Sequence, residues 1–174
     1  MGLDISVYTH VTPLPETGAW DEEPDWDAGV RRIYQNACFI TRGAGVELPK
    51  AQPGRDGSSD FHFGDFSVSE GPSFHAGSYS GYNRWREQLA SLVGADLDGL
   101  WADGGTDVPF GELLNFTDCE GFLGPEVCHR LMRDFQDHHS AAQVHFDEYG
   151  LEKYEAWMRG VELAAKNSGV VVFH

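Results

Sequence analysis

The segment FHAGSYSGYNRWREQL at residues 74–89 carries a dense set of side chains that could bind a ligand. Glycines let backbone N–H groups approach a ligand, hydroxyl groups form hydrogen bonds, and arginine holds an anion through a charge-assisted fork. A helix that follows such a turn presents further N–H groups to an anion. We therefore predict a ligand-binding set in this segment, composed of His75, Ser78, Tyr79, Ser80, Asn83 and Arg84.

The same segment lacks the signatures of two common catalytic loops. Gly77-Ser78-Tyr79-Ser80-Gly81 has tyrosine where a nucleophile elbow has serine, which argues against a serine hydrolase. The chain also has no G-x-x-x-x-G-K-[ST] phosphate-binding loop. The alternative is a plain turn that leads into a helix with Ser80 as its N-cap, and this alternative stays open.

A second polar segment, NFTDCEG at residues 115–121, places two carboxylates two residues apart. Asp118 and Glu120 would share one side of an extended segment, where they could accept hydrogen bonds, act as a base or bind a metal. They could equally bond to backbone amides of a turn. Cys119 lies between the two acids, which disfavour a thiolate, so we predict no nucleophile there. Asn115, Asp118 and Glu120 complete the predicted ligand-binding set.

We expect these two segments to face each other across one polar pocket. Arginine would hold the anionic group of a ligand, and the carboxylates would accept hydrogen bonds from its amino or hydroxyl groups. A nucleotide-like or otherwise phosphorylated small molecule has this combination of groups. Alternatively, Arg84 pairs with Asp118 or Glu120 and braces the fold.

Eight histidines raise the alternative of a metal-dependent hydrolase. His62 and His75 could meet Asp118 or Glu120 in space, but no H-E-x-x-H or comparable spacing is present. We expect His138 and His139 to lie at a helix C-terminus, where the helix dipole favours a cation. We therefore predict no metal site and no cofactor, and the residues do not decide whether the protein is an enzyme.

The composition excludes several classes of partner. The chain has 174 residues, a net charge of −16 and only 12 Lys and Arg residues, so nucleic acid and anionic membranes are disfavoured. The acidity supports a third hypothesis, an inhibitor that binds a basic host protein. Three cysteines without a C-x-x-C motif, and no signal-peptide or membrane-spanning pattern, predict a cytoplasmic protein.

The hydrophobic patterns predict a single α+β domain over residues 1–174. We expect a small, mostly antiparallel sheet that includes both chain ends, packed by about three helices. One helix should begin at Ser80 and end at Gly94, with Asn83, Arg84 and Arg86 exposed, and another should begin at Pro125. The other expected elements are strands over 3–11, 38–41, 61–68 and 170–173, a helix over 151–165, and irregular loops over 43–60 and 94–111.

Three stretches of the chain also show a family resemblance. MGLDISVY at 1–8, FHAGSYSGYNRWR at 74–86 and NFTDCEGFLGPEVCHRLMRDF at 115–135 resemble small uncharacterised proteins of phages and bacteria. Those proteins begin Met-Gly-Leu-Asp and carry an Asp-x-Glu-Gly-x-x-Gly-Pro segment. The resemblance implies a cytoplasmic, phage-derived accessory protein and assigns no catalytic residue.

Overall fold

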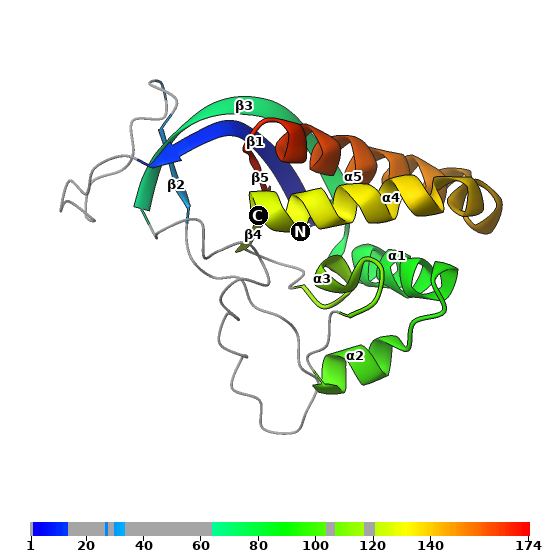
Figure 1. The fold of residues 1–174 in the computed structure, drawn as a ribbon. Coiled ribbons are helices and arrows are strands. Elements are labelled where there is room, and N and C mark those ends of the chain that lie inside the picture. Colours follow the sequence, from blue (N-terminus) through cyan, green and yellow to red (C-terminus); the bar gives the residue numbers. More distant parts are fainter. Residues whose placement is uncertain (1, 14–26, 28–29, 34–63, 104–106, 117–120) are drawn as a thin grey trace.

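A five-stranded antiparallel sheet covered by helices forms the fold in a computed structural model that describes residues 2–13, 27, 30–33, 64–103, 107–116 and 121–174. The strand order is β2-β3-β1-β5-β4, so the strands nearest the two chain ends lie side by side (Figure 1). The elements in chain order are β1 (Leu3–Pro13), β2 (Val30–Ile33), β3 (Gly64–Gly77), α1 (Tyr79–Leu92), α2 (Leu97–Asp103), α3 (Gly111–Leu114), β4 (Gly121–Leu123), α4 (Pro125–His145), α5 (Glu148–Lys166) and β5 (Val170–Phe173). This arrangement confirms the predicted α+β class.

The alternating pattern of the first strand sets the orientation of the sheet. Leu3, Ile5 and Val7 are fully or almost fully buried, while the polar residues between them lie on the other face. β1 pairs with β3 on one side and with β5 on the other. Register shifts within the long β1–β3 pair accompany the strong curvature of these two strands in Figure 1.

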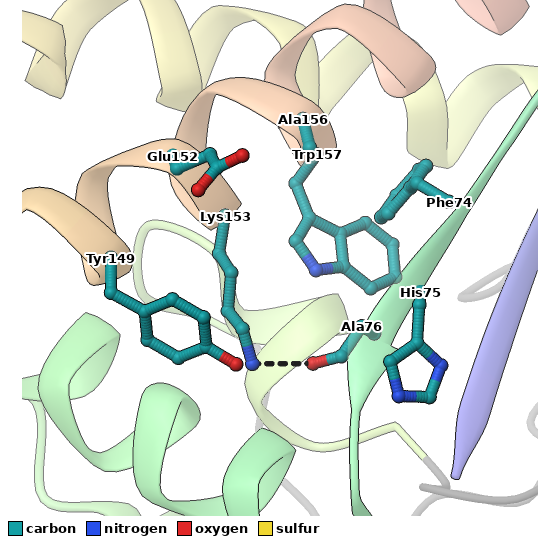
Figure 2. A pocket seen from close by; sticks show the side chains of 8 residues that line it. All are labelled: Phe74, His75, Ala76, Tyr149, Glu152, Lys153, Ala156 and Trp157. Atoms are coloured by element: carbon teal, nitrogen blue, oxygen red, sulfur yellow. Dashed lines mark hydrogen bonds between the residues drawn. The ribbon is translucent and has the colours of Figure 1, made fainter.

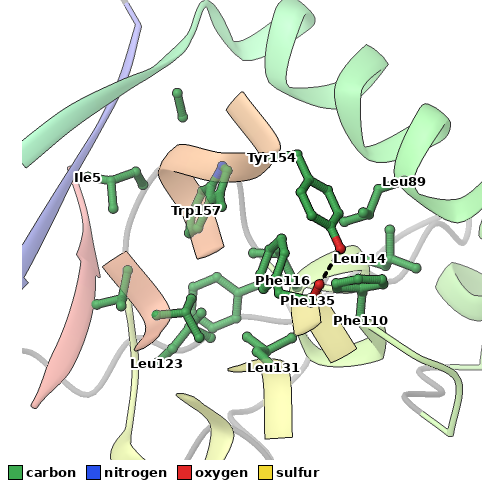
Figure 3. Close-up of a cluster of buried hydrophobic side chains, with 14 of the residues drawn as sticks. Ile5, Leu89, Phe110, Leu114, Phe116, Leu123, Leu131, Phe135, Tyr154 and Trp157 are labelled. Atoms are coloured by element: carbon green, nitrogen blue, oxygen red, sulfur yellow. Dashed lines mark hydrogen bonds between the residues drawn. The ribbon is translucent and has the colours of Figure 1, made fainter. Parts of the chain in front are cut away.

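Helices α4 and α5 lie side by side beneath the arch of β1 and β3 (Figure 1). Their buried residues recur with helical spacing, and α5 packs directly against β1, β3 and β5. Trp157 and Tyr154 of α5 are buried at the centre of the core, where the Tyr154 hydroxyl donates a 2.8 Å hydrogen bond to the Phe135 carbonyl (Figure 3). Helix α5 therefore lies between the sheet and α4 and packs against both.

Helix α1 follows β3 after a single residue and closes the open end of this core. Tyr82, Trp85 and Leu89 are buried, as their spacing predicts. Ser78, rather than Ser80, is the N-cap, and its side chain accepts a 3.1 Å hydrogen bond from the Gly81 N–H. The cap lies earlier than predicted because Tyr79 and Ser80 already have helical backbone.

Two other expectations need correction. The connection over 94–111 contains the helix α2, so it is not wholly irregular. His138 and His139 lie inside α4, which continues to His145, and so they are not at its C-terminus. The predicted strand at 38–41 and loop at 43–60 lie outside the described residues.

In the part of the chain that the structure describes, no helix has the length and apolar character needed to cross a bilayer.

Candidate functional site

Two neighbouring cavities lie where the end of β3 meets the first turns of α1 and α5. The larger has a volume of about 320 Å³, and residues of β3 and α5 line it (Figure 2). The smaller has a volume of about 160 Å³ and lies between α1 and the start of α5. Tyr149 and Lys153 line both cavities, so the two hollows share one wall.

Lys153 is the central charged residue of this site. It is 9% exposed, and its Nζ donates a 2.7 Å hydrogen bond to the Ala76 carbonyl oxygen. The ammonium also lies over the Tyr149 ring, 4.6 Å from its centroid. Among the described residues, no carboxylate lies within 4.0 Å of Nζ. An ammonium has three N–H donors, so this buried charge can donate further hydrogen bonds.

The local sequence explains why a lysine is buried here. Lys153 precedes Trp157 by four residues on α5, so both side chains lie on the helix face that packs against β3. Gly77, with φ +112°, leaves the space for the ammonium, because a Cβ at this position would lie 2.6 Å from Nζ. Asp147 fixes the start of α5 by accepting a 2.8 Å hydrogen bond from the Gly150 N–H.

The wall of the larger cavity is mainly aromatic and aliphatic. The Phe74 and Trp157 rings meet almost at a right angle, with centroids 5.2 Å apart. Ala76 and Ala156 have small side chains that leave the hollow open. Within the described residues the buried Nε1–H of Trp157 has no acceptor, and Figure 2 shows this nitrogen on the side of the indole that is turned toward Lys153.

His75 lines the larger cavity near the end of β3. Its Nδ1 donates to the Asp4 carboxylate at 2.8 Å across the β1–β3 pair. Both side chains are more than half exposed, at 58% and 68%, so this hydrogen bond contributes little to stability.

The other predicted residues of the first segment lie around the start of α1. Ser78 and Ser80 are exposed, with their hydroxyl oxygens 3.3 Å apart, and Tyr79 packs half-buried against the core. Arg84 is exposed and lines the smaller cavity next to Lys153. Helix geometry thus places Arg84 on the side of α1 that faces α5.

The prediction that Asn83 and Arg86 are exposed was wrong, because Asn83 is half-buried and the Arg86 side chain is fully buried on the side of α1 opposite Arg84. Its Nη1 donates to the carbonyls of Phe116 at 2.5 Å and Leu114 at 3.5 Å, and its Nη2 donates to the Asn83 side chain. Asn115 is buried at the C-cap of α3 in the same region. The structure therefore brings Arg86 and Asn83, but not Arg84, to the 114–116 segment.

The remaining predicted residues, Asp118 and Glu120, lie outside the described residues, as do His62 and Cys119. The predicted contact across the pocket with Asp118 and Glu120 therefore stays a prediction. Within the described ranges, no group of three or more His, Cys, Asp or Glu side chains is placed to hold a metal ion.

A third cavity, of about 380 Å³, lies between α4 and the residues around α3. Arg130 donates to the Glu112 carboxylate at 2.5 Å, and Asp134 accepts a 2.8 Å hydrogen bond from the Phe110 N–H. Burial raises the pKa of Asp134 above its usual range. The arginines that line this cavity, Arg130 and Arg133, are not buried, and Arg130 already pairs with Glu112, so the cavity offers less to a ligand than the Lys153 cavities.

Lys153, Tyr149 and Trp157 were absent from the predicted set. The spacing of residues does indicate that Lys153 is buried. It precedes Trp157 by four residues and Val161 by eight, so it lies on the same apolar helix face as these two residues. A lysine on a buried helix face requires a specific acceptor or a ligand. The segment at 74–89 is dense in polar residues, whereas this site depends on a single buried charge.

Comparison with known proteins finds no family model, no curated protein and no solved structure that matches this chain.

Proposed function

We propose that the protein binds an anionic small molecule in the cavity beside Lys153. The observation that carries this proposal is the buried Lys153 ammonium, which borders a cavity of about 320 Å³ and has no carboxylate within 4.0 Å among the described residues. Burying a charge without an opposite charge costs free energy, and an anion in the cavity would remove part of that cost.

Several predicted ligand-binding residues lie on the rim of this site. His75 lines the larger cavity and Arg84 the smaller one, and the turn that begins α1 lies close to Lys153 through Ala76 and Gly77. The volume is at the lower end of the roughly 300–1,000 Å³ typical of ligand pockets. Nucleotide-like and other phosphorylated molecules are the ligand class that the sequence suggests.

The test is calorimetric titration and thermal unfolding of the full chain with benzoate, inorganic phosphate and AMP. A ligand that binds only the folded state raises the unfolding temperature, and at a hundred times Kd the gain is about 2.7 kcal/mol. We expect at least one anion to stabilise the wild type and to lose this effect in Lys153→Met.

Lys166→Met is the matched control because it removes the same charge from an exposed site on the same helix, where Lys166 pairs with Glu162 at 2.5 Å. This variant should respond to the anion as the wild type does. If no anion stabilises the wild type, or if both lysine variants respond equally, the proposal fails.

The metal-dependent hydrolase and the acidic inhibitor of a host protein stay predictions, as does the phage-derived origin. No geometry among the described residues favours them over ligand binding.

A further inference from the structure

We propose that the ligand is a flat aromatic molecule that carries a single carboxylate; this inference rests on the proposed function. Three properties of the larger cavity lead to this ligand class: its charge, the shape of its aromatic wall and its unused hydrogen-bond donors.

The charge of the site matches one negative charge and not several. Lys153 is the only buried cation among the described residues that line the two cavities, because Arg84 is exposed. Glu152 and Asp147 bring carboxylates to the same cavities. A triphosphate would add several negative charges to a chain whose net charge is already −16, with one buried ammonium to oppose them.

The shape of the wall favours a planar ring. Phe74 and Trp157 form a corner with an interplanar angle of 84°, and Ala76 and Ala156 leave the space in front of it open. A flat ring that stacks on the half-buried Phe74 ring lies perpendicular to the buried Trp157 ring, and aromatic pairs prefer both arrangements. The exposed Tyr149 ring, 64% accessible, lies at the junction with the smaller cavity.

The donors favour a carboxylate as the anionic group. Lys153 uses one N–H on the Ala76 carbonyl and lies over the Tyr149 ring, which leaves a donor for a ligand oxygen. The Trp157 Nε1–H has no acceptor among the described residues and faces the Lys153 side. A carboxylate has two oxygens, so one can accept from the ammonium and the other, after a small shift of the flexible lysine, from the indole.

The experiment compares four probes by calorimetric titration of the full chain: 2-naphthoate, its neutral amide 2-naphthamide, cyclohexanecarboxylate and ATP. We expect 2-naphthoate to bind at least about tenfold more tightly than each of the others, as loss of one charge-assisted hydrogen bond or of the aromatic stacking predicts. The comparison of acid with amide needs no variant, so it holds even where a substitution impairs folding.

Two substitutions locate the binding. Lys153→Met should remove the preference for naphthoate over naphthamide. Ala156→Leu should fill the hollow and weaken naphthoate binding by about tenfold, consistent with a steric clash in a packed pocket. Ala141→Leu, on an exposed position of α4, is the matched control and should leave the affinity unchanged.

The outcomes separate this inference from the proposed function. If ATP or cyclohexanecarboxylate binds as tightly as naphthoate and the binding depends on Lys153, the ligand class is wrong and anion binding stands. If the amide binds as well as the acid, the carboxylate has no role and the inference fails. If neither these probes nor the anions tested above bind, both proposals fail.

Discussion

Two buried cations, Arg86 on α1 and Lys153 on α5, lie within the same core and differ in how their charge is accommodated. Arg86 is fully buried, donates to two backbone carbonyls and to the Asn83 side chain, and stacks over the Tyr82 and Trp101 rings. Among the described residues, Lys153 has one carbonyl acceptor, at Ala76, and lies over one aromatic ring, that of Tyr149, and it borders a cavity.

The difference follows from the chemistry of the two side chains. A guanidinium has five N–H donors in a rigid fork, so it can connect several carbonyls and hold two segments together. An ammonium on a flexible stem is a compact charge that can turn toward a ligand. A buried cation is therefore a structural brace where its donors are used by the fold, and a candidate binding residue where they face a hollow.

The largest expected effect on stability is that of a substitution at Arg86. Arg86→Met should lower the free energy of unfolding by about 3 kcal/mol, because the Phe116 carbonyl would lose a close buried donor. The Leu114 carbonyl would keep its 3.1 Å hydrogen bond from the Trp101 Nε1–H. Urea denaturation followed by tryptophan fluorescence measures this loss. Arg84→Met removes the same charge from an exposed position two residues away and should cost less than about 0.5 kcal/mol.

The alkylation rate of Cys128 provides a second, independent comparison of Arg86→Met with Arg84→Met. Burial raises the pKa of its thiol to about 12, so in the folded state it should resist alkylation at pH 8. Peptide mapping after iodoacetamide treatment should show faster modification of Cys128 in Arg86→Met than in Arg84→Met. Equal rates in the two variants would contradict the role of Arg86 as a brace.

The next largest effect on stability is expected at Gly77, where the absence of a side chain leaves room for the Lys153 ammonium. Gly77→Ala should lower the free energy of unfolding by about 2 kcal/mol, because alanine disfavours φ +112° and its Cβ would lie 2.6 Å from Lys153 Nζ. Gly94→Ala is the control, since Gly94 also has positive φ but no atom within 4 Å of its added Cβ. A loss at Gly77 no larger than at Gly94 would mean that the contact with Lys153 is unimportant.

Lys153→Met should have a smaller effect on stability than either change. Methionine fills a similar volume without a buried charge, so the free energy of unfolding should change by less than about 1 kcal/mol. Thermal and urea unfolding of the ligand-free protein measure this. A loss close to 3 kcal/mol would make Lys153 a second brace and would remove the contrast with Arg86.

The smallest effect concerns Asp134, a half-buried carboxyl group on α4. Because burial raises its pKa in the folded state, the unfolded state loses its proton first as pH rises, and the protein loses stability through that range. Asp134→Asn keeps an acceptor for the Phe110 N–H and should gain less than about 1 kcal/mol at pH 7 relative to pH 3. A gain for Asp134→Asn that is independent of pH would contradict this explanation.

The sequence predicts the fold better than the site. Alternation at Leu3, Ile5 and Val7 and helical spacing from Tyr154 to Val161 reflect burial of whole faces, and this pattern is visible along the chain. The position of Ser78 as the cap is less predictable because two serines, Ser78 and Ser80, lie two residues apart and either could take this role.

The site depends on contacts between distant segments, which periodicity does not specify. Arg84 and Arg86 are two residues apart and look equivalent in the sequence, but helical geometry places them on different sides of α1. Lys153 approaches Ala76 only because α5 packs on β3. Asp118 and Glu120 lie outside the described residues, so their predicted role awaits experiment.

The place of β5 in the sheet has a consequence for synthesis of the protein. Val170–Phe173 lies between β1 and β4 in the sheet. In the chain, β1 precedes it by more than a hundred residues and β4 by about fifty. A nascent chain on the ribosome therefore cannot complete the sheet until Phe173 has left the exit tunnel. Until then the inner edge of β1 is unpaired, and this is the stage at which chaperones would protect the chain from aggregation.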